Sequence, residues 1–309
     1  MVHNNILEAI GHTPMVKLNR ITDEECADIY VKVESLNVGG SIKTRTAYEM
    51  ITAAEEDGLL DKDSIIVEPT SGNQGIGIAL IGAVKGYKTI IIMPDSVSEE
   101  RRRLCEHYGA QVVLIHDKGN IGECISDCAY TAIRMAQMNS HVYVPQQFIN
   151  PNNVKAHCDT TGTEILEQVG KKIDGFVAGI GTGGTISGVG KVLKEANPDI
   201  EIWALEPDKA AILSGDKDIK THQQMGIGDG IIPAILDQKI YDKVHIVTDD
   251  VAIQTSRDLA RLEGLMVGIS SGTNVAAAIE LARKLGPGKT VVTILPDTAE
   301  RYFSTPLFE

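Results

Sequence analysis

Apolar residues gather in short runs along this chain, and longer amphipathic or charged segments separate the runs. A short apolar run is typical of a buried strand, and a longer amphipathic segment is typical of a helix. The predicted strands span residues 15–18, 29–34, 65–67, 89–94, 112–115, 141–144, 175–178, 201–206, 244–247 and 290–295. The predicted helices span residues 6–10, 43–56, 98–108, 122–138, 162–169, 186–196 and 249–263, and a further helix begins at residue 76. This alternation indicates an α/β fold with parallel-rich sheets.

A polar loop with two prolines, residues 145–153, interrupts the alternation near the middle of the chain. A chain of 309 residues can hold two domains of ordinary size. We therefore predict an N-terminal α/β domain, residues 1–145, and a C-terminal α/β domain, residues 146–309.

Composition narrows the classes of function. The net charge is −13 at pH 7, so neither nucleic acid nor an anionic membrane is expected as a partner. No apolar run approaches the roughly 20 residues that span a bilayer, and the first residues lack the pattern of a signal peptide. We therefore predict a cytoplasmic protein.

The chain has five cysteines, and Cys124 and Cys128 lie one helical turn apart. This spacing makes a metal pair conceivable. However, no C-x-x-C motif or nearby histidine completes a site, and buried free thiols are common. We interpret the cysteines as structural and predict no metal site.

The turn after the strand at 65–67 carries the first candidate chemistry, Thr70-Ser71-Gly72-Asn73-Gln74-Gly75. Ligands of open α/β sheets bind at the carboxyl ends of strands, and free N–H groups at a helix start attract anions. Thr70, Ser71 and Asn73 can donate hydrogen bonds without adding charge, which suits a carboxylate. An ordinary turn with a Ser/Asn helix cap explains the same residues equally well.

Lys43 follows a glycine turn, residues 39–42, and lies in the first turn of a predicted helix. The helix dipole disfavours a lysine at that position, so its presence there calls for a functional reason. A solvated surface lysine is the alternative, because lysine side chains are usually exposed.

The loop Gly179-Ile180-Gly181-Thr182-Gly183-Gly184-Thr185 also connects a strand to a helix. Its glycines let backbone N–H groups approach a phosphate, and Thr182 and Thr185 add hydroxyl donors. A dinucleotide loop would follow the first strand, but Glu206 has a spacing compatible with a ribose ligand, so this alternative stays open. No G-x-x-x-x-G-K-[ST] motif is present, which excludes a P-loop nucleotidase. The loop fits one phosphate better than a pyrophosphate.

A further strand-to-helix turn lies at residues 268–272. One phosphate, one lysine and one carboxylate-binding turn are what an aldimine cofactor with an amino-acid substrate requires. With these motifs in register, the chain closely resembles the cysteine synthase/cystathionine β-synthase family of pyridoxal-phosphate enzymes. The resemblance runs from Ile10-Gly11-His12-Thr13-Pro14 to residues 300–305. It implies fold type II, with two three-layer αβα domains, mostly parallel sheets and pyridoxal 5′-phosphate in the interdomain cleft. It also implies a homodimer and N-terminal residues that pack on the second domain.

The resemblance implies a role for each candidate residue. Lys43 would carry the cofactor as a Schiff base and move the α-proton. The substrate carboxylate would be held by Thr70, Ser71, Asn73, Gln74 and Gln147, with Asn73 also near the cofactor. The phosphate would be bound by Gly181, Thr182, Gly183, Gly184 and Thr185. Ser270 would face the pyridine nitrogen and leave it largely unprotonated, which favours loss of a β-substituent over transamination.

Three positions depart from the usual family motifs. Thr44 replaces the aspartate that usually follows the lysine, and Gln74 replaces a threonine of the substrate turn. Asp229, between Gly228 and Gly230, stands where typical O-acetylserine sulfhydrylases carry a small apolar residue. A carboxylate there could act as a base on water or hold the ammonium group of a second amino acid. A structural Asx turn is the alternative.

An acid at position 229 resembles the bacterial cysteine lyases of this family that release hydrogen sulfide. We therefore predict an enzyme that eliminates sulfide from L-cysteine through an aminoacrylate, to which water adds to give L-serine. The alternatives are cysteine synthesis from O-acetylserine and sulfide, and cystathionine or lanthionine synthesis. A nucleotide-binding protein without chemistry, which would use only the glycine loop, is the alternative from another class.

Overall fold

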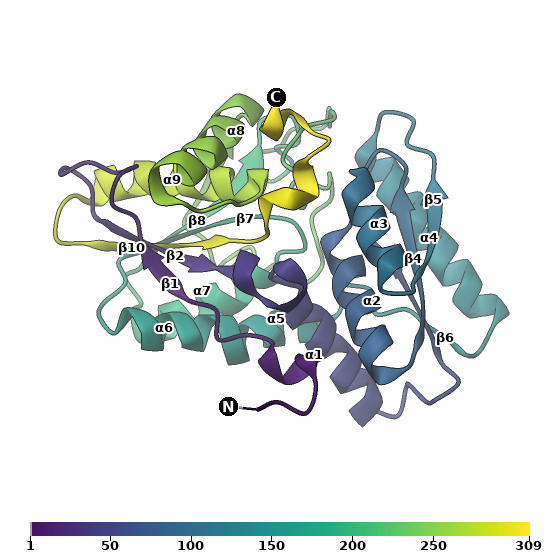
Figure 1. Ribbon diagram of the computed structural model, residues 1–309. Helices are drawn as coiled ribbons and strands as arrows, with labels where there is room; N and C mark the ends of the chain where they lie inside the picture. Colours follow the sequence, from purple (N-terminus) through teal and green to yellow (C-terminus); the bar gives the residue numbers. More distant parts are fainter. Residues whose placement is uncertain (1) are drawn as a thin grey trace.

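The computed structural model describes residues 2–309 and contains two sheets (Figure 1). The larger sheet has six strands in the order β1-β2-β10-β7-β8-β9, and the smaller has four in the order β5-β4-β3-β6. The strands are β1 Met15–Lys17, β2 Asp28–Val33, β3 Ile65–Pro69, β4 Lys88–Pro94, β5 Gln111–Ile115, β6 Val142–Tyr143, β7 Gly175–Gly179, β8 Glu201–Pro207, β9 Lys243–Val247 and β10 Thr290–Leu295. Strand β1 is antiparallel to β2, and the other pairs are parallel. The expectation of an α/β fold with parallel-rich sheets is confirmed.

Helices connect the strands and cover both sheets. The α-helices are α1 Lys43–Glu56, α2 Asn73–Lys85, α3 Glu99–His107, α4 Ile121–Met138, α5 Pro151–Ala156, α6 Thr163–Val169, α7 Gly184–Ala196, α8 Asp249–Asp258 and α9 Ile269–Leu285. Single π-helical turns follow α5 (His157–Gly162) and α8 (Leu259–Glu263). Short 3₁₀ turns occupy Ile6–Ala9, Glu34–Leu36, Val38–Gly40, Ala299–Tyr302 and Pro306–Phe308. Within residues 2–309, no helix is long and apolar enough to cross a bilayer.

The larger sheet is buried on both faces, and alternate residues of its strands enter different cores. In β10, Val291 and Leu295 belong to the core that includes residues of α8 and α9. Val292 and Ile294 belong to the core that includes residues of α6 and α7. This period of two follows from the pleat of a strand. It explains why the strand reads as a continuous apolar run in the sequence.

The smaller sheet is layered in the same way. Ile66 of β3 packs in a core with residues of α1, α2 and α3, and the neighbouring Val67 packs against α4. Cys124 and Cys128 are buried on the inner face of α4 in this second core. All five cysteines carry free thiols.

The chain enters the larger sheet, leaves it, and returns. Strand β2 pairs along its whole length with β10, at the other end of the sequence. The chain then passes through α1 to the smaller sheet and comes back through α5. The helix predicted at 162–169 begins earlier in the structure, because α5, the π turn and α6 are continuous from Pro151 to Val169. The domain limits 1–145 and 146–309 stay a prediction. In the structure, β1 and β2 from the first range belong to the larger sheet, together with the strands of the second range.

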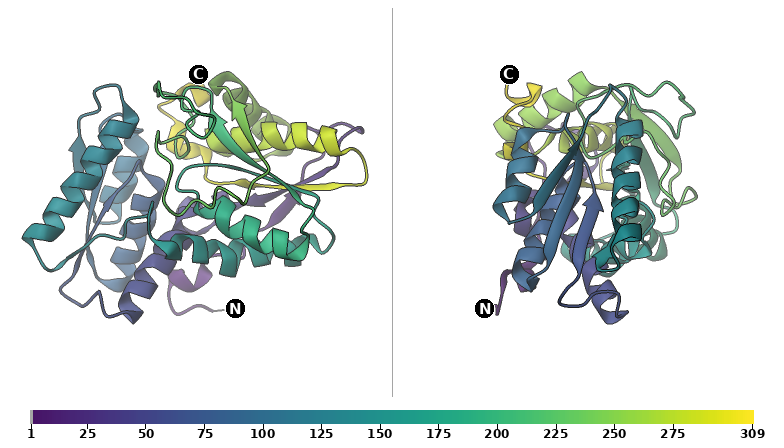
Figure 2. Two further views of the ribbon diagram at one scale, coloured as in Figure 1. Left: turned by 180° about the vertical axis from the view of Figure 1, so that it is seen from behind. Right: turned by 90° about the vertical axis from the view of Figure 1, so that its right-hand side faces the viewer.

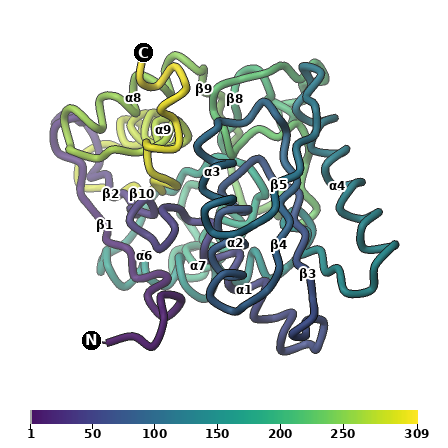
Figure 3. The backbone as a smooth tube through the Cα atoms, turned by 45° about the vertical axis from the view of Figure 1, so that its right-hand side comes forward, coloured from purple at the N-terminus to yellow at the C-terminus, as the bar shows by residue number. Residues whose placement is uncertain are grey.

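The carboxyl ends of the central strands of both sheets meet one cavity. Residues that follow β3, β7 and β10 line it together, at Thr70, Gly181 and Pro296. Figure 2 shows the two sheets beside each other, each with its helices. The C-terminal segment reaches the smaller half (Figure 3). The Ser98 hydroxyl donates to the Arg301 carbonyl at 2.8 Å. The fold thus places several strand ends around one site.

Candidate active site

A cavity lies between the two sheets, where polar side chains and glycines of both halves converge. It brings together candidate residues that lie far apart in the sequence. The candidates that line it are Lys43, Thr70, Ser71, Asn73, Gln74, Gln147, Gly181, Thr182, Gly183, Thr185, Asp229 and Ser270. Gly184 does not line the cavity but begins α7 directly behind the loop.

Lys43 is the first residue of α1, and its amine points into this cavity. Burial lowers the pKa of the amine, while the nearby carboxyl groups of Asp229 and Asp297 oppose that effect. A lowered pKa increases the neutral fraction of the amine, which is the form that attacks a carbonyl. The local environment therefore favours an imine-forming lysine.

The turn from Thr70 to Gln74 is held in shape by its own contacts. The Thr70 hydroxyl accepts a hydrogen bond from the Gly72 N–H at 3.0 Å. Gly72 has φ of 143°, which is accessible to glycine but strained for other residues. Asn73 begins α2 and donates to Asp297 Oδ2 at 2.7 Å. The Gln74 side-chain carbonyl accepts from the Thr46 hydroxyl at 2.7 Å, which ties the turn to α1.

Gln147 reaches the same cavity from a loop that Glu68 holds. The backbone N–H groups of Gln146 and Gln147 donate to the two carboxyl oxygens of Glu68 at 2.9 and 3.0 Å. Glu68 is fully buried in β3, and burial raises its pKa to about 8. The carboxyl group therefore serves as a fixed acceptor that positions the loop.

The glycine loop ends at the N-terminus of α7, where no side chain caps the helix. The Gly184 N–H makes only a long hydrogen bond, 3.4 Å, to the Thr182 hydroxyl. The helix start can therefore still bind an anion, which the helix dipole also favours. The Thr182 hydroxyl accepts from the Asn153 side chain at 3.0 Å. The Thr185 hydroxyl lies 3.3 Å from Nε2 of His157, which is buried. This arrangement suits one phosphate group.

Asn153 and His157 support the loop, although the sequence analysis did not identify them. Both come from the helical segment that begins at Pro151, and its first residues lie in the stretch interpreted as a polar loop. Neither residue belongs to a motif. Only their positions against Thr182 and Thr185 mark them as parts of the site.

Ser270 lies in the first turn of α9, which also begins without a side-chain cap. Its side chain is buried, and the residue lines the cavity beside Asn274. A hydroxyl here can donate or accept a single hydrogen bond without carrying charge. The position fits a contact with the heterocyclic nitrogen of a cofactor.

Asp229 lines this cavity and also a second, neighbouring cavity. Its side chain is 9% exposed, and burial raises the pKa of its carboxyl group, against the effect of His222 and Lys43. His222 Nε2 lies 3.0 Å from the Gly228 carbonyl, and its Nδ1 accepts from the Gln224 N–H at 3.1 Å. His222 therefore ties down the loop that carries Asp229.

The residues present fit a phosphate-bearing aldehyde such as pyridoxal 5′-phosphate. An amine of lowered pKa, an uncapped helix N-terminus with a glycine loop, and a buried hydroxyl all line one cavity. Packing explains the glycine at the start of α7, because a Cβ at Gly184 would lie 2.0 Å from Asn153 Oδ1. Among residues 2–309, no group of three or more His, Cys, Asp or Glu side chains is arranged to hold a metal ion.

Comparison with known proteins identifies the family. The pyridoxal-phosphate dependent enzyme family matches residues 6–297. The chain is 49% identical to a cysteine synthase of Staphylococcus aureus over 309 residues, which cover 99% of this chain and 97% of the relative. A crystal structure of O-ureido-L-serine synthase superposes with a TM-score of 0.94 at 41% identity, covering 100% of this chain and 96% of the other.

A hydrogen sulfide-producing enzyme from Fusobacterium nucleatum superposes with a TM-score of 0.92 at 40% identity, covering 98% of this chain and 100% of the other. These similarities extend over nearly the whole chain and include the strands and loops that line the cavity. The chain therefore belongs to the family of pyridoxal-phosphate dependent enzymes, as a fold type II member of the cysteine synthase group.

Proposed function

We propose that this enzyme releases hydrogen sulfide from L-cysteine and adds water to the remaining three-carbon unit, giving L-serine. The reaction is L-cysteine plus water to L-serine plus hydrogen sulfide, in which a C–S bond breaks and a C–O bond forms at the β-carbon. The observation that carries the proposal is Asp229, a buried carboxyl group on the wall of the cavity that contains Lys43.

The cofactor would be held by Lys43, by Ser270 and by the loop from Gly181 to Thr185, and when bound it withdraws electrons from the substrate α-carbon. Thr70, Ser71, Asn73 and Gln147, with Gln74 behind them, would orient the substrate carboxylate. The Lys43 amine would remove the α-proton and later return it. These roles rest on the cavity that the residues share.

Asp229 would act in the second half of the reaction. Its carboxylate would take a proton from water as the oxygen attacks the β-carbon. Asp229 lines both the cavity that contains Lys43 and a neighbouring cavity, which supports a contact with water beside the substrate. The similarity to the hydrogen sulfide-producing enzyme of F. nucleatum supports this proposal.

Cysteine synthesis from O-acetylserine and sulfide is the second candidate function. The cysteine synthase of S. aureus, 49% identical to this chain, favours it. Both reactions share the first half and differ in the nucleophile that attacks the β-carbon. Formation of cystathionine or lanthionine would use a thiol amino acid at the same step. In each of these cases Asp229 would position an amine or support the loop rather than activate water.

The test measures sulfide and amino acids together, with the purified holoenzyme and L-cysteine alone. We expect equal amounts of sulfide and serine. In Asp229→Asn, we expect serine formation to fall by about a hundredfold, within the range of a lost general base, while sulfide still appears in the first turnover. Asp218→Asn is the matched control, because Asp218 lies in the same segment with an exposed side chain.

Unchanged serine formation in Asp229→Asn would contradict the role of this residue. Lanthionine in place of serine would show that a second cysteine is the nucleophile. Little sulfide from cysteine, together with rapid cysteine formation from O-acetylserine and sulfide, would identify a cysteine synthase. We also propose that the enzyme is a cytoplasmic homodimer, which sedimentation of the purified protein would test for the oligomeric state.

A further inference from the structure

The turn that would bind the substrate carboxylate contains only neutral side chains. Thr70, Ser71 and Asn73 donate hydrogen bonds but carry no charge, and the same is true of Gln147. An anion in a partly buried cavity loses hydration that neutral donors restore only in part. A positive charge close to the turn would compensate for this loss.

Arg101 provides a positive charge directly behind the turn. It belongs to α3, is 1% exposed, and lines the cavity together with Ser71 and Asn73. Its side chain packs against Gly72 so closely that a Cβ there would lie 2.2 Å from Arg101 Cδ and 3.0 Å from Nε. The contact gives a second reason for glycine at position 72.

The guanidinium group of Arg101 has few partners for a buried charge. Nη1 contacts the sulfur of Met225, the group stacks on the Tyr302 ring with 4.7 Å to the centroid, and Nη2 lies 3.7 Å from Asp297 Oδ2. Nε and Nη2 are buried and donate no hydrogen bond within the described chain. Asp297 is therefore its nearest counter-charge, at a distance longer than a hydrogen bond.

Asp297 is shared with other groups and does not neutralise the cluster. It accepts from Asn73 at 2.7 Å and from the Tyr302 hydroxyl at 2.9 Å. Arg301, also buried, donates to the Asn73 side-chain oxygen and to the Gly39 carbonyl. Two guanidinium groups, Arg101 and Arg301, thus surround one carboxylate. Lys43 and Asp229 line the same cavity.

We propose that Arg101 is a positioning residue that gives the substrate turn its preference for an α-carboxylate over an uncharged group. The Arg101–Asp297–Arg301 cluster lies behind Gly72 and carries one more positive than negative charge. Asn73 connects the turn to this cluster through hydrogen bonds with Asp297 and Arg301. The turn supplies hydrogen bonds, and the cluster supplies the charge. The inference rests on the proposed binding of the substrate carboxylate at residues 70–73.

The test compares two ligands that differ only in that group. L-Alanine and L-alaninamide have no leaving group on the β-carbon, and the absorbance of the bound cofactor reports their binding to the holoenzyme. The measured quantity is the ratio of the dissociation constant of L-alaninamide to that of L-alanine. The basicity of the two amines differs, but this difference cancels when the ratio is compared between variants.

In Arg101→Met we expect this ratio to fall about tenfold or more, with little change in the binding of L-alaninamide. Arg101→Lys keeps the charge and should keep most of the preference. Asp297→Asn removes the negative charge and should raise the ratio, which a purely structural role would not do. Arg103→Gln is the matched control on α3, since Arg103 is 70% exposed. With L-cysteine as substrate, Arg101→Met should raise KM more than it lowers kcat.

An unchanged ratio in Arg101→Met, or equal weakening of both ligands, would overturn the inference. If Arg101→Met does not fold, the other two variants still test the inference. Loss of the preference for L-alanine in Arg101→Lys, or a lower ratio in Asp297→Asn, would contradict the charge argument. A wild-type enzyme that binds both ligands equally would contradict the proposed carboxylate turn itself. Failure of the Asp229 assay leaves these ligand ratios unaffected, so the two proposals fail separately.

Discussion

At the scale of single residues, the two buried carboxyl groups of Glu68 and Asp229 both have raised pKa values but different surroundings. Glu68 is buried in β3, and its pKa rises to about 8 although two backbone N–H groups donate to it. Asp229 has a raised pKa as well, but His222 and Lys43 oppose the shift, and its side chain meets the cavity. Glu68 therefore supports a loop, while Asp229 lines the cavity, as its proposed role requires.

The raised pKa of Glu68 makes stability depend on pH. Between the ordinary glutamate value of 4.5 and about 8, the folded protein keeps a proton that the unfolded chain releases, so the free energy of unfolding falls as pH rises. We expect Glu68→Gln to remove this contribution. Relative to the variant, the wild type should lose about 1.4 kcal/mol per pH unit across that interval.

Urea unfolding from pH 5 to 8 measures this difference. Glu24→Gln is the control, because Glu24 is exposed and should show no such trend. A constant difference between wild type and Glu68→Gln over the interval would mean that Glu68 is ionised in the folded protein. The two N–H donors would then outweigh burial.

At the scale of elements, Thr185 near the start of α7 and Ser270 near the start of α9 line the proposed cofactor site together. Both helices begin at the end of a strand or bridge, and neither has a side-chain cap. The uncapped N–H groups cost stability unless a ligand satisfies them. A phosphate at α7 would satisfy such groups, which links the missing cap of this helix to the proposed cofactor binding.

We predict that Gly184→Ala weakens cofactor binding at least tenfold. The new Cβ would lie 2.0 Å from Asn153 Oδ1, so Asn153 or the glycine loop must move, and the N–H groups of α7 move with it. Titration of the apoenzyme with pyridoxal 5′-phosphate measures the affinity.

Gly86→Ala, at the end of α2, is the control for this variant. A Cβ at Gly86 would meet no atom within 4 Å, but the backbone there is left-handed, with φ of 86°. The substitution should cost about 1 kcal/mol of stability and leave the affinity unchanged. Wild-type affinity in Gly184→Ala would show that the loop tolerates the shift.

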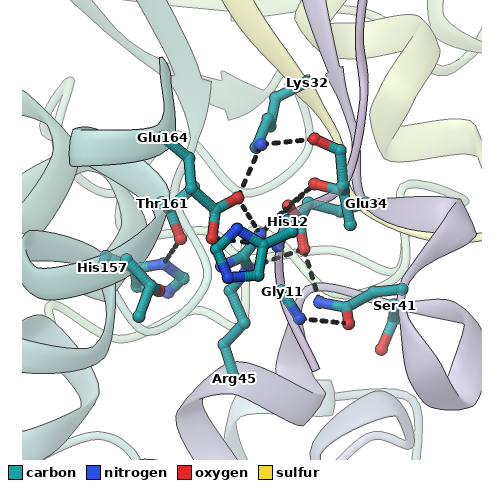
Figure 4. A network of polar contacts seen from close by, with 12 residues as sticks. Gly11, His12, Lys32, Glu34, Ser41, Arg45, His157, Thr161 and Glu164 are labelled. Atoms are coloured by element: carbon teal, nitrogen blue, oxygen red, sulfur yellow. Dashed lines mark hydrogen bonds and ion pairs between the residues drawn. The ribbon is translucent and has the colours of Figure 1, made fainter. Parts of the chain in front are cut away.

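At the scale of the whole molecule, a buried ionic network joins segments from both halves of the sequence (Figure 4). Arg45 of α1 pairs with Glu34 at 2.9 Å and with Glu164 at 2.6 Å, and Glu164 also pairs with Lys32 at 2.7 Å. Two positive and two negative groups balance each other, in contrast to the cluster around Arg101. Because Arg45 lies two residues after Lys43, this balanced network fixes the start of α1.

Arg45→Ala should lower the free energy of unfolding by about 3–5 kcal/mol, because it leaves the buried Glu34 without an ion-pair partner and Glu164 with Lys32 alone. Denaturant unfolding at neutral pH measures the change. Lys220→Ala is the control, since Lys220 forms an exposed pair with Asp218 and should cost less than about 1 kcal/mol. A loss of less than about 1 kcal/mol for Arg45→Ala would show that water replaces the arginine as the partner of the two carboxylates.

The sequence predicted the strands and most of the helices, because these depend on local patterns, and the resemblance to a known family added cavity residues such as Gln147 and Asp229. Apolar runs such as Thr290–Leu295 mark strands that are buried on both faces. Glycines and hydroxyl residues at strand ends, as in Thr70–Gly75, mark turns where ligands bind. Helix α5 was missed because its polar residues follow Pro151, and proline is compatible with both a loop and the first position of a helix.

Only the tertiary structure decided which charges are buried and what surrounds them. Residues 99–103 read as a charged surface helix, yet Arg101 is buried while Arg103 is exposed. The difference arises because the C-terminal segment, with Tyr302, covers one face of α3. Such burial depends on contacts between residues about 200 positions apart, and no local pattern records them. Local patterns therefore determined the elements and the reacting groups, and long-range packing determined their electrostatics.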